Sequence, residues 1–329
     1  MRRVLTVFIG LALLTAACGD DGGTLTVYSG RNEALVGPLI ERFRNETGIE
    51  VEVRYGDSPE LAATIREEAG NSPADVFFAQ DPASLGAVAE AGLFSVLPGD
   101  LMDDVPARFS DPQSRWIGVS GRSRVLVYDT RDVDPATLPA EVTGVTDPAW
   151  AGRVAIAPTN GSFVAFVAAM ILIDGEEATR AWLTDLARGA APTYSGNSTI
   201  VAAVDDGEVD AGLVNHYYLF RRIAELGSAD AANHFFSSGA GALVMPAGAG
   251  VLASSDQTDD ARRFVAFLLE TESQRYFATE TFEYPLVPSV DATPALPPLE
   301  SLGQPDIDLS ALAGALDLAT DLIADTGLL

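Results

Sequence analysis

Strand patterns that alternate with helix patterns fill residues 24–91, and this alternation constrains the fold more than any other feature. Short β-rich runs at 24–28, 49–55 and 74–79 are each followed by a helical pattern. The first helix carries apolar residues on one face and ends at Thr47-Gly48. This alternation predicts an α/β fold with a mainly parallel sheet and helices on both faces.

The carboxyl ends of these strands are candidate ligand positions, because open α/β sheets bind ligands beyond those ends. The ends carry Ser29 to Asn32 and Gln80-Asp81. The second half of the chain continues in the same style, with predicted strands at 125–128, 154–156, 211–214 and 241–252. Predicted helices there span 163–173, 175–188, 258–271, 273–278 and about 309–323, and the Pro-rich run 293–305 is expected to be irregular.

The N-terminus predicts a location outside the cytoplasm. Arg2 and Arg3 precede an apolar run that is too short to span a bilayer but fits a signal peptide, predicted at 1–17. Small residues before Cys18 resemble a bacterial lipobox, so Cys18 is expected to carry lipid and 18–23 to form a polar tether. Cys18 is the only cysteine and has no disulfide partner. A plain signal peptide and a cytosolic chain with an apolar start are the alternatives.

The charge and the motif inventory argue for binding rather than catalysis. The formal net charge is -27 and all 20 basic residues are Arg, which excludes nucleic acid as an expected partner. The chain has two histidines, His216 and His234, and lacks a nucleophile elbow, a P-loop, a dinucleotide fingerprint and a cysteine cluster for zinc. We therefore expect no enzymatic activity.

The adjacent pair Tyr217-Tyr218 is the most informative candidate site. The pair follows a predicted strand and precedes a predicted helix, a junction at which both side chains can face one cleft. Two phenol oxygens form a hard oxygen site that suits ferric iron. A phenol with a pKa of about 10 binds only a metal acidic enough to displace its proton, as Fe(III) is. Ordinary packing of two tyrosines is the alternative.

From Leu25 almost to the C-terminus the chain resembles the bacterial ferric-binding proteins, the receptors of iron(III) ABC importers. The matching blocks stand in the family's order: Val27-Tyr28-Ser29-Gly30-Arg31, Thr47-Gly48-Ile49, Pro73-Ala74-Asp75-Val76-Phe77, the run from Ser120 to Thr130, Pro158-Thr159-Asn160-Gly161, Asn197-Ser198, Asn215-His216-Tyr217-Tyr218, Gly241-Ala242-Leu243-Val244 and Glu283-Tyr284-Pro285-Leu286. The resemblance implies a two-lobed periplasmic binding protein type II fold with a hinged cleft between the lobes. It also implies that Tyr217 and Tyr218 are iron ligands.

The sequence departs from the family's best-known site. Asn32 and Gln80 stand where the family pattern has a His and a Glu, and no Tyr stands between Asn160 and Phe163. Two phenolates fill two of the about six positions that a ferric ion takes, so the resemblance implies a synergistic anion, carbonate or phosphate, plus water. Candidate residues for binding the anion or supporting the metal ligands share polar side chains or a helix start: Arg31, Asn32, Gln80, Asp81, Asn160, Gly161, Ser162, Asn197 and Asn215. For Arg31, Arg122 and Arg124, a structural salt bridge on the acidic surface is the alternative.

The resemblance divides the chain into two lobes. Residues 24–124 with about 248–298 are expected to form the N-terminal lobe, and 125–247 with about 299–329 the C-terminal lobe. The expected hinge lies near Phe109 and Met245-Pro246. The expected function is a monomeric lipoprotein that delivers ferric iron to an ABC transporter permease, with the lipid as its only membrane contact. The same fold binding another solute, such as an oxyanion or a small organic cation, stays open, as do a lipid-anchored hydrolase and an adhesion or sensor role.

Overall fold

The computed structural model describes residues 23–328. The expected signal peptide, the lipidated Cys18 and all of the expected tether except Gly23 lie outside the described residues. Within them, no helix combines the length and the apolar character that crossing a membrane requires.

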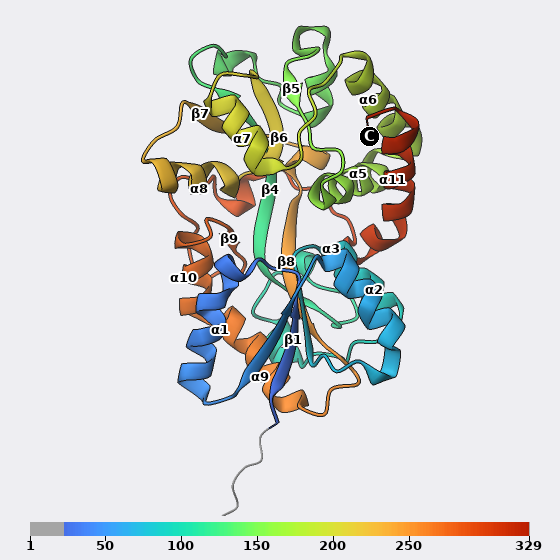
Figure 1. The fold of residues 1–329 in the computed structure, drawn as a ribbon, viewed down its shortest axis with the longest axis vertical. Coiled ribbons are helices and arrows are strands. Elements are labelled where there is room, and N and C mark those ends of the chain that lie inside the picture. Colours follow the sequence, from blue (N-terminus) through green and yellow to red (C-terminus); the bar gives the residue numbers. More distant parts are fainter. Residues whose placement is uncertain (1–22, 329) are drawn as a thin grey trace, which may run out of the picture.

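The structure has an N-terminal and a C-terminal half connected by two long strands (Figure 1). One half holds β1, β2 and β3 with α1, α2, α3, α9 and α10, and the other holds β5, β6 and β7 with α5 to α8 and α11. The strands are β1 (Leu25–Ser29), β2 (Val51–Tyr55), β3 (Val76–Ala79), β4 (Ile117–Asp129), β5 (Val154–Ala155), β6 (Ala211–Asn215), β7 (Ala231–Phe235), β8 (Val244–Val251) and β9 (Tyr284–Pro285). The helices are α1 (Glu33–Thr47), α2 (Ser58–Glu68), α3 (Pro82–Glu90), α4 (Gly99–Met102), α5 (Gly161–Asp174), α6 (Glu176–Arg188), α7 (Asn197–Asp205), α8 (Tyr217–Leu226), α9 (Thr258–Leu269), α10 (Thr271–Thr279) and α11 (Leu316–Asp325). The predicted α/β class is confirmed.

The sheet is mixed, so the expectation of a mainly parallel sheet is wrong. Its order is β2-β1-β3-β8-β4-β6-β5, with β7 and β9 also paired to β4. Only the β1–β2, β1–β3 and β5–β6 pairs of the described chain are parallel. The antiparallel pairs arise because β4 and β8 run in opposite directions between the two halves, and every pairing of these two strands is antiparallel.

Strand β4 changes partners at one point along its length. Its first part, up to Ser123, pairs with β8, and Arg124 to Tyr128 pair with β6. A backbone irregularity between Gly118 and Ser120 interrupts the β8 register. Residues at this changeover therefore lie where the two halves meet.

Helix α1 shows how local sequence sets the bounds and the buried face of an element. The Asn32 side chain accepts a hydrogen bond from the Ala34 N–H at the start, and Gly48 ends the helix with φ 74°. The buried face consists of Val36, Leu39, Ile40 and Phe43. The predicted stop at Thr47-Gly48 is borne out, and so is the predicted apolar stripe at Leu39, Ile40 and Phe43.

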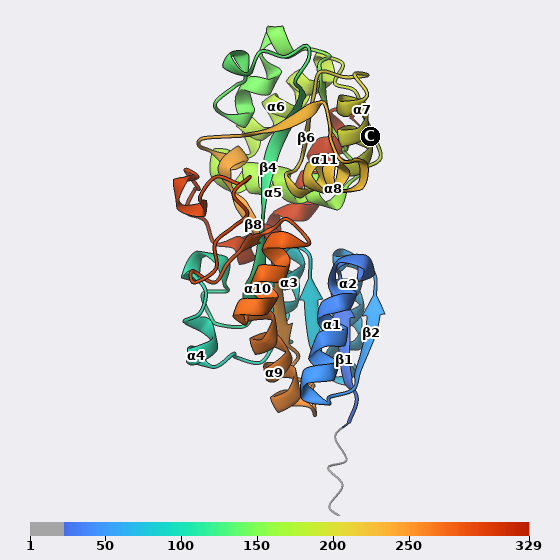
Figure 2. The same ribbon diagram turned by 90° about the vertical axis from the view of Figure 1, so that its left-hand side faces the viewer.

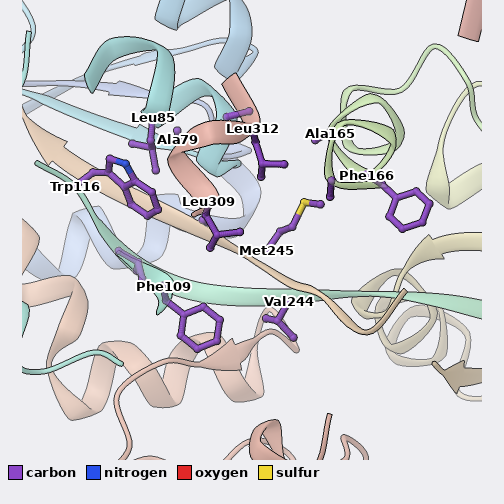
Figure 3. Packing of buried hydrophobic residues seen from close by; sticks show 14 of the residues in the cluster. Ala79, Leu85, Phe109, Trp116, Ala165, Phe166, Val244, Met245, Leu309 and Leu312 are labelled. Atoms are coloured by element: carbon purple, nitrogen blue, oxygen red, sulfur yellow. The ribbon is translucent and has the colours of Figure 1, made fainter. Parts of the chain in front are cut away.

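A 3₁₀ segment, Leu309–Ala315, packs between the halves (Figure 3). It contacts both α3 and α5 and carries Leu309 and Leu312 into the apolar cluster. The Trp116 indole N–H donates to Ser310 Oγ at 3.1 Å. The predicted final helix at 309–323 thus divides into this segment and α11, which lies against α5 (Figures 1 and 2).

Candidate functional site

A cavity of about 680 Å³ opens between the two halves. Its walls come from both halves and from β4, which places Arg122 and Arg124 between them. The lining includes Gly30, Asp57, Ser58, Glu60, Gln80, Asp81, Arg122, Arg124, Asn160, Gly161, Ser162, Asn215, Tyr218, Met245 and Asp317.

Tyr217 and Tyr218 form a stacked pair at the start of α8, directly after β6. Their ring centroids lie 4.4 Å apart with 26° between the planes. Tyr218 lines the cavity, and Tyr217 lies behind it with 2% of its surface exposed. The stacked rings therefore lie against each other rather than on opposite faces of the chain. The junction therefore brings two phenols together beside the cavity.

Burial and the neighbouring Tyr218 raise the pKa of Tyr217 well above the usual range, and the Arg122 charge lowers it in part. Tyr217 is consequently a neutral phenol in the metal-free protein. A cation that binds its oxygen must displace the proton, which restricts the site to strongly acidic metal ions.

Two buried guanidinium groups project from β4 on the same side of the strand, because they stand two residues apart. The Arg122 Nη2 group donates to the Gln80 carbonyl of the N-terminal half, and its Nε and Nη1 are buried without a hydrogen-bond partner. Arg124 donates to Asn197 Oδ1 at 3.3 Å and to Ser162 of the C-terminal half. Each arginine is therefore anchored to a different half.

Neither Arg122 nor Arg124 forms a salt bridge with a carboxylate of the described chain. The alternative of a surface salt bridge therefore fails for both. Burial and, to a smaller extent, the adjacent Arg122 charge lower the pKa of Arg124 to about 9. Two buried cations that lack a direct salt-bridge partner make this wall of the cavity suited to an anion.

The expected anion-binding residues of the C-terminal half come together at the start of α5. Asn160 caps this helix, accepting from the Ser162 N–H at 3.1 Å and from its hydroxyl at 2.6 Å. Asn197 donates to Asn160 Oδ1 at 3.2 Å and accepts from the Asn215 N–H at 2.9 Å. Asn160, Gly161, Ser162 and Asn215 line the cavity, whereas Asn197 supports them from behind.

Arg31 and Asn32 do not line the cavity. Arg31 is 2% exposed and forms a bidentate ion pair with Glu283, at 2.9 and 2.6 Å. Ser120 and Thr281 also donate to Glu283, at 3.1 and 3.0 Å. Asn32 is exposed and is occupied as the cap of α1. Arg31 is thus in a salt bridge, as the alternative reading proposed, but a buried one.

The N-terminal half contributes carboxylates to the cavity wall. Asp81 caps α3 through Ser84, with contacts of 2.8 and 3.0 Å, and burial raises the pKa of Asp81. Asp57 and Glu60 of the same half and Asp317 on α11 of the C-terminal half also line the cavity, and sequence reasoning missed them because no motif distinguishes them from the other acidic residues. The described residues contain no cluster of three or more His, Cys, Asp or Glu side chains suited to a metal ion. The tyrosine pair is therefore the strongest metal-binding feature of this cavity.

Residues 71–308 match the family model of the bacterial extracellular solute-binding proteins. The chain belongs to this family. Among its curated relatives in the family, the major ferric iron-binding protein of Neisseria meningitidis serogroup B is 35% identical over 99% of this chain and 98% of its own length. The Fe(3+)-binding periplasmic protein of Serratia marcescens is 34% identical over 95% and 93%.

Solved structures of similar solute-binding proteins agree with the two-lobed fold. Iron-bound HitA from Pseudomonas aeruginosa has a TM-score of 0.86 and 36% identity, over 92% of this chain and 99% of that chain. Trichodesmium FutA, solved with iron and citrate ligands, has a TM-score of 0.81 and 27% identity, over 93% and 99%. The predicted fold class and the predicted family resemblance are confirmed, and the two halves are the two lobes of this fold.

Proposed function

We propose that this solute-binding protein captures ferric iron outside the cytoplasm, with Tyr217 and Tyr218 as phenolate ligands. The observation that carries the proposal is the stacked phenol pair at a cavity wall that also holds two guanidinium groups without a salt bridge, one of which, Arg122, keeps buried nitrogens without a hydrogen-bond partner. A trivalent hard cation can ionise buried phenols, whereas Ca²⁺ and Mg²⁺ cannot. The ferric-binding relatives support this choice of cargo.

A synergistic anion completes the proposed site. Two phenolates leave about four iron positions open, and the anion fills some of them while its charge offsets Arg122 and Arg124. The start of α5 adds backbone N–H donors on the same cavity wall. Carbonate and phosphate fit this arrangement, and the relative solved with iron and citrate supports a carboxylate anion as well.

Transport follows from closure of the lobes over the loaded site. We place the hinge near Phe109 and Met245-Pro246 and the lobe boundaries at 124/125, about 247/248 and about 298/299, close to the changeover of β4 partners. The closed monomer then delivers iron to an ABC transporter permease. Lipid on Cys18 keeps the protein at the membrane.

An oxyanion receptor is the second candidate function. Arg122, with two buried nitrogens that lack a hydrogen-bond partner, and the neighbouring Arg124 favour it, because they can bind an anion whether or not iron is present. In that case the tyrosines serve only as hydrogen-bond donors.

The experiment is a titration of metal-free protein with ferric nitrilotriacetate, followed by visible absorption. Iron bound to two phenolates gives a coloured charge-transfer band that Tyr217→Phe and Tyr218→Phe each weaken and the double variant abolishes. Tyr128→Phe, in the strand β4 away from the cavity lining, is the matched control and keeps the band. A colourless protein that binds phosphate tightly would replace the iron proposal with the oxyanion receptor.

A further inference from the structure

His216 lies directly before the tyrosine pair and is completely buried. Its backbone N–H donates to the Ser123 carbonyl at 3.1 Å, and its carbonyl accepts from Asn233 Nδ2 at 2.9 Å. Its ring Nδ1 accepts from the Ser123 N–H at 3.1 Å, and its Nε2 contacts the Phe282 carbonyl at 2.7 Å. Because one ring nitrogen faces an N–H and the other faces a carbonyl, the hydrogen bonds require the neutral tautomer with hydrogen on Nε2.

These contacts exclude His216 as an iron ligand in this arrangement. A metal binds the lone pair of a neutral imidazole nitrogen, and the Nδ1 lone pair is occupied by the Ser123 N–H while Nε2 carries hydrogen. Metal coordination would therefore break a buried hydrogen bond. The ring instead connects two backbone segments next to the proposed ligands through its hydrogen bonds.

Phe282, the hydrogen-bond partner, lies between α10 and β9 and links the N-terminal lobe to α8. It has φ 58°, an uncommon value for a bulky residue, so surrounding contacts must hold it. Its ring lies 5.9 Å from that of Phe220 on α8. The next residue, Glu283, holds Arg31 from the loop after β1. A continuous set of contacts thus runs from that loop to the tyrosine helix.

We propose that His216 is a positioning residue for iron binding. Its hydrogen bond to the Phe282 carbonyl fixes the orientation of the Tyr217 and Tyr218 side chains. This inference rests on the proposed function. The ring centroid of His216 lies 5.9 Å from that of Tyr217 and 5.3 Å from that of Tyr284, two residues after Phe282. Losing the Phe282 bond frees the start of α8 to rotate and alters the orientation of both phenols. Outer-shell hydrogen bonds of this kind commonly change metal affinity by about 10- to 100-fold.

Two amide variants separate the two ring contacts. In His216→Gln the side-chain amide reaches the position of Nε2 and keeps a donor for Phe282, whereas in His216→Asn the shorter amide replaces Nδ1 and keeps only the acceptor for Ser123. Each variant leaves one buried hydrogen-bond partner of His216 unpaired. A purely structural role of the ring therefore predicts similar losses of iron affinity in both variants. The control is His234→Asn, because His234 Nε2 also lies 2.8 Å from a backbone carbonyl, that of Pro139.

The measurement is iron affinity by competition with nitrilotriacetate, together with the maximum of the charge-transfer band. We expect His216→Asn to lose about tenfold in affinity and to shift the band, His216→Gln to lose clearly less, and His234→Asn to match the wild type. Equal losses in both His216 variants, or wild-type behaviour of His216→Asn, would overturn the inference while leaving the proposed function intact. A colourless wild-type protein would overturn both.

If His216→Asn does not fold, Phe282→Gly tests the same link from its other end, because the hydrogen-bond acceptor remains but the ring that fixes its position is lost. Glycine accepts the positive φ and keeps the backbone carbonyl, but it removes the ring that packs against Phe220. The inference predicts a shifted band and faster iron release in this variant. A band and a release rate equal to those of the wild type would contradict it.

Discussion

The buried ion pair between Arg31 and Glu283 offers a test of how the cavity is supported. Both side chains are 1% exposed, and the two residues lie 252 positions apart in the chain. Glu283→Gln keeps the side-chain size and its hydrogen-bonding capacity but leaves the Arg31 charge without a counter-charge. The Arg31 pKa is raised by Glu283 against the effect of burial, so the pair is stable only as a charged unit.

The expected loss follows from removing one partner of a fully desolvated pair, which costs about 3–5 kcal/mol. Unfolding entropy of about 2.1 cal/mol/K per residue gives about 0.7 kcal/mol/K for a chain of 329 residues, so the melting temperature falls by about 4–7 °C. Arg31→Met combined with Glu283→Gln removes both charges. The double variant should therefore be more stable than Glu283→Gln alone.

Urea unfolding of the metal-free protein, followed by tryptophan fluorescence, measures these differences. The account requires a strongly favourable coupling energy between the two substitutions in the double-mutant cycle. A loss below about 1 kcal/mol in Glu283→Gln, or losses that add in the double variant, would refute the reasoning that the pair is desolvated.

Three further predictions concern the anion, pH and the membrane. Arg122→Gln should weaken phosphate binding to the metal-free protein about tenfold, as calorimetry can measure, whereas Arg188→Gln on the exposed part of α6 should not; equal affinities would remove Arg122 from the anion site. Burial lowers the pKa of His216 to about 4 from 6.5, so in that interval the unfolded chain binds a proton that the folded protein does not. The contribution of His216 to the free energy of unfolding is therefore fully present above pH 6.5 and falls by about 2 kcal/mol between pH 7 and pH 5. Urea titrations of His216→Gln should lack this pH-dependent loss of stability. Cys18→Ser should move the protein from the membrane fraction to the soluble fraction, and unchanged fractionation would exclude the lipid anchor.

The elements with local signals were predictable from sequence. The helix α1 has a cap, an apolar stripe and a stop glycine within 17 residues, Asn32 to Gly48, and α5 is an apolar run that the structure buries. The family resemblance gave the lobed fold because its blocks occur in a fixed order along the whole chain. The tyrosine pair was identifiable because its chemistry is carried by two adjacent residues.

Features that depend on distant partners were not predictable. The first half of β4 contains Gly118, Ser120 and Gly121 in place of an apolar alternation, and it is a strand because β8 pairs with it. β7 was missed, since only one of its five residues is fully buried and no strong apolar pattern marks it. The partners of Arg31 and His216 are brought close only by the tertiary fold.

The most direct test of the central claim is a crystal structure of the iron-loaded protein with anomalous scattering measured at the iron absorption edge. The account predicts one strong anomalous peak in the cavity between the lobes, bonded to the phenol oxygens of Tyr217 and Tyr218, with an anion between the iron and Arg122. An iron peak away from these two oxygens, or a filled cavity with both phenols still unbonded to metal, would contradict it.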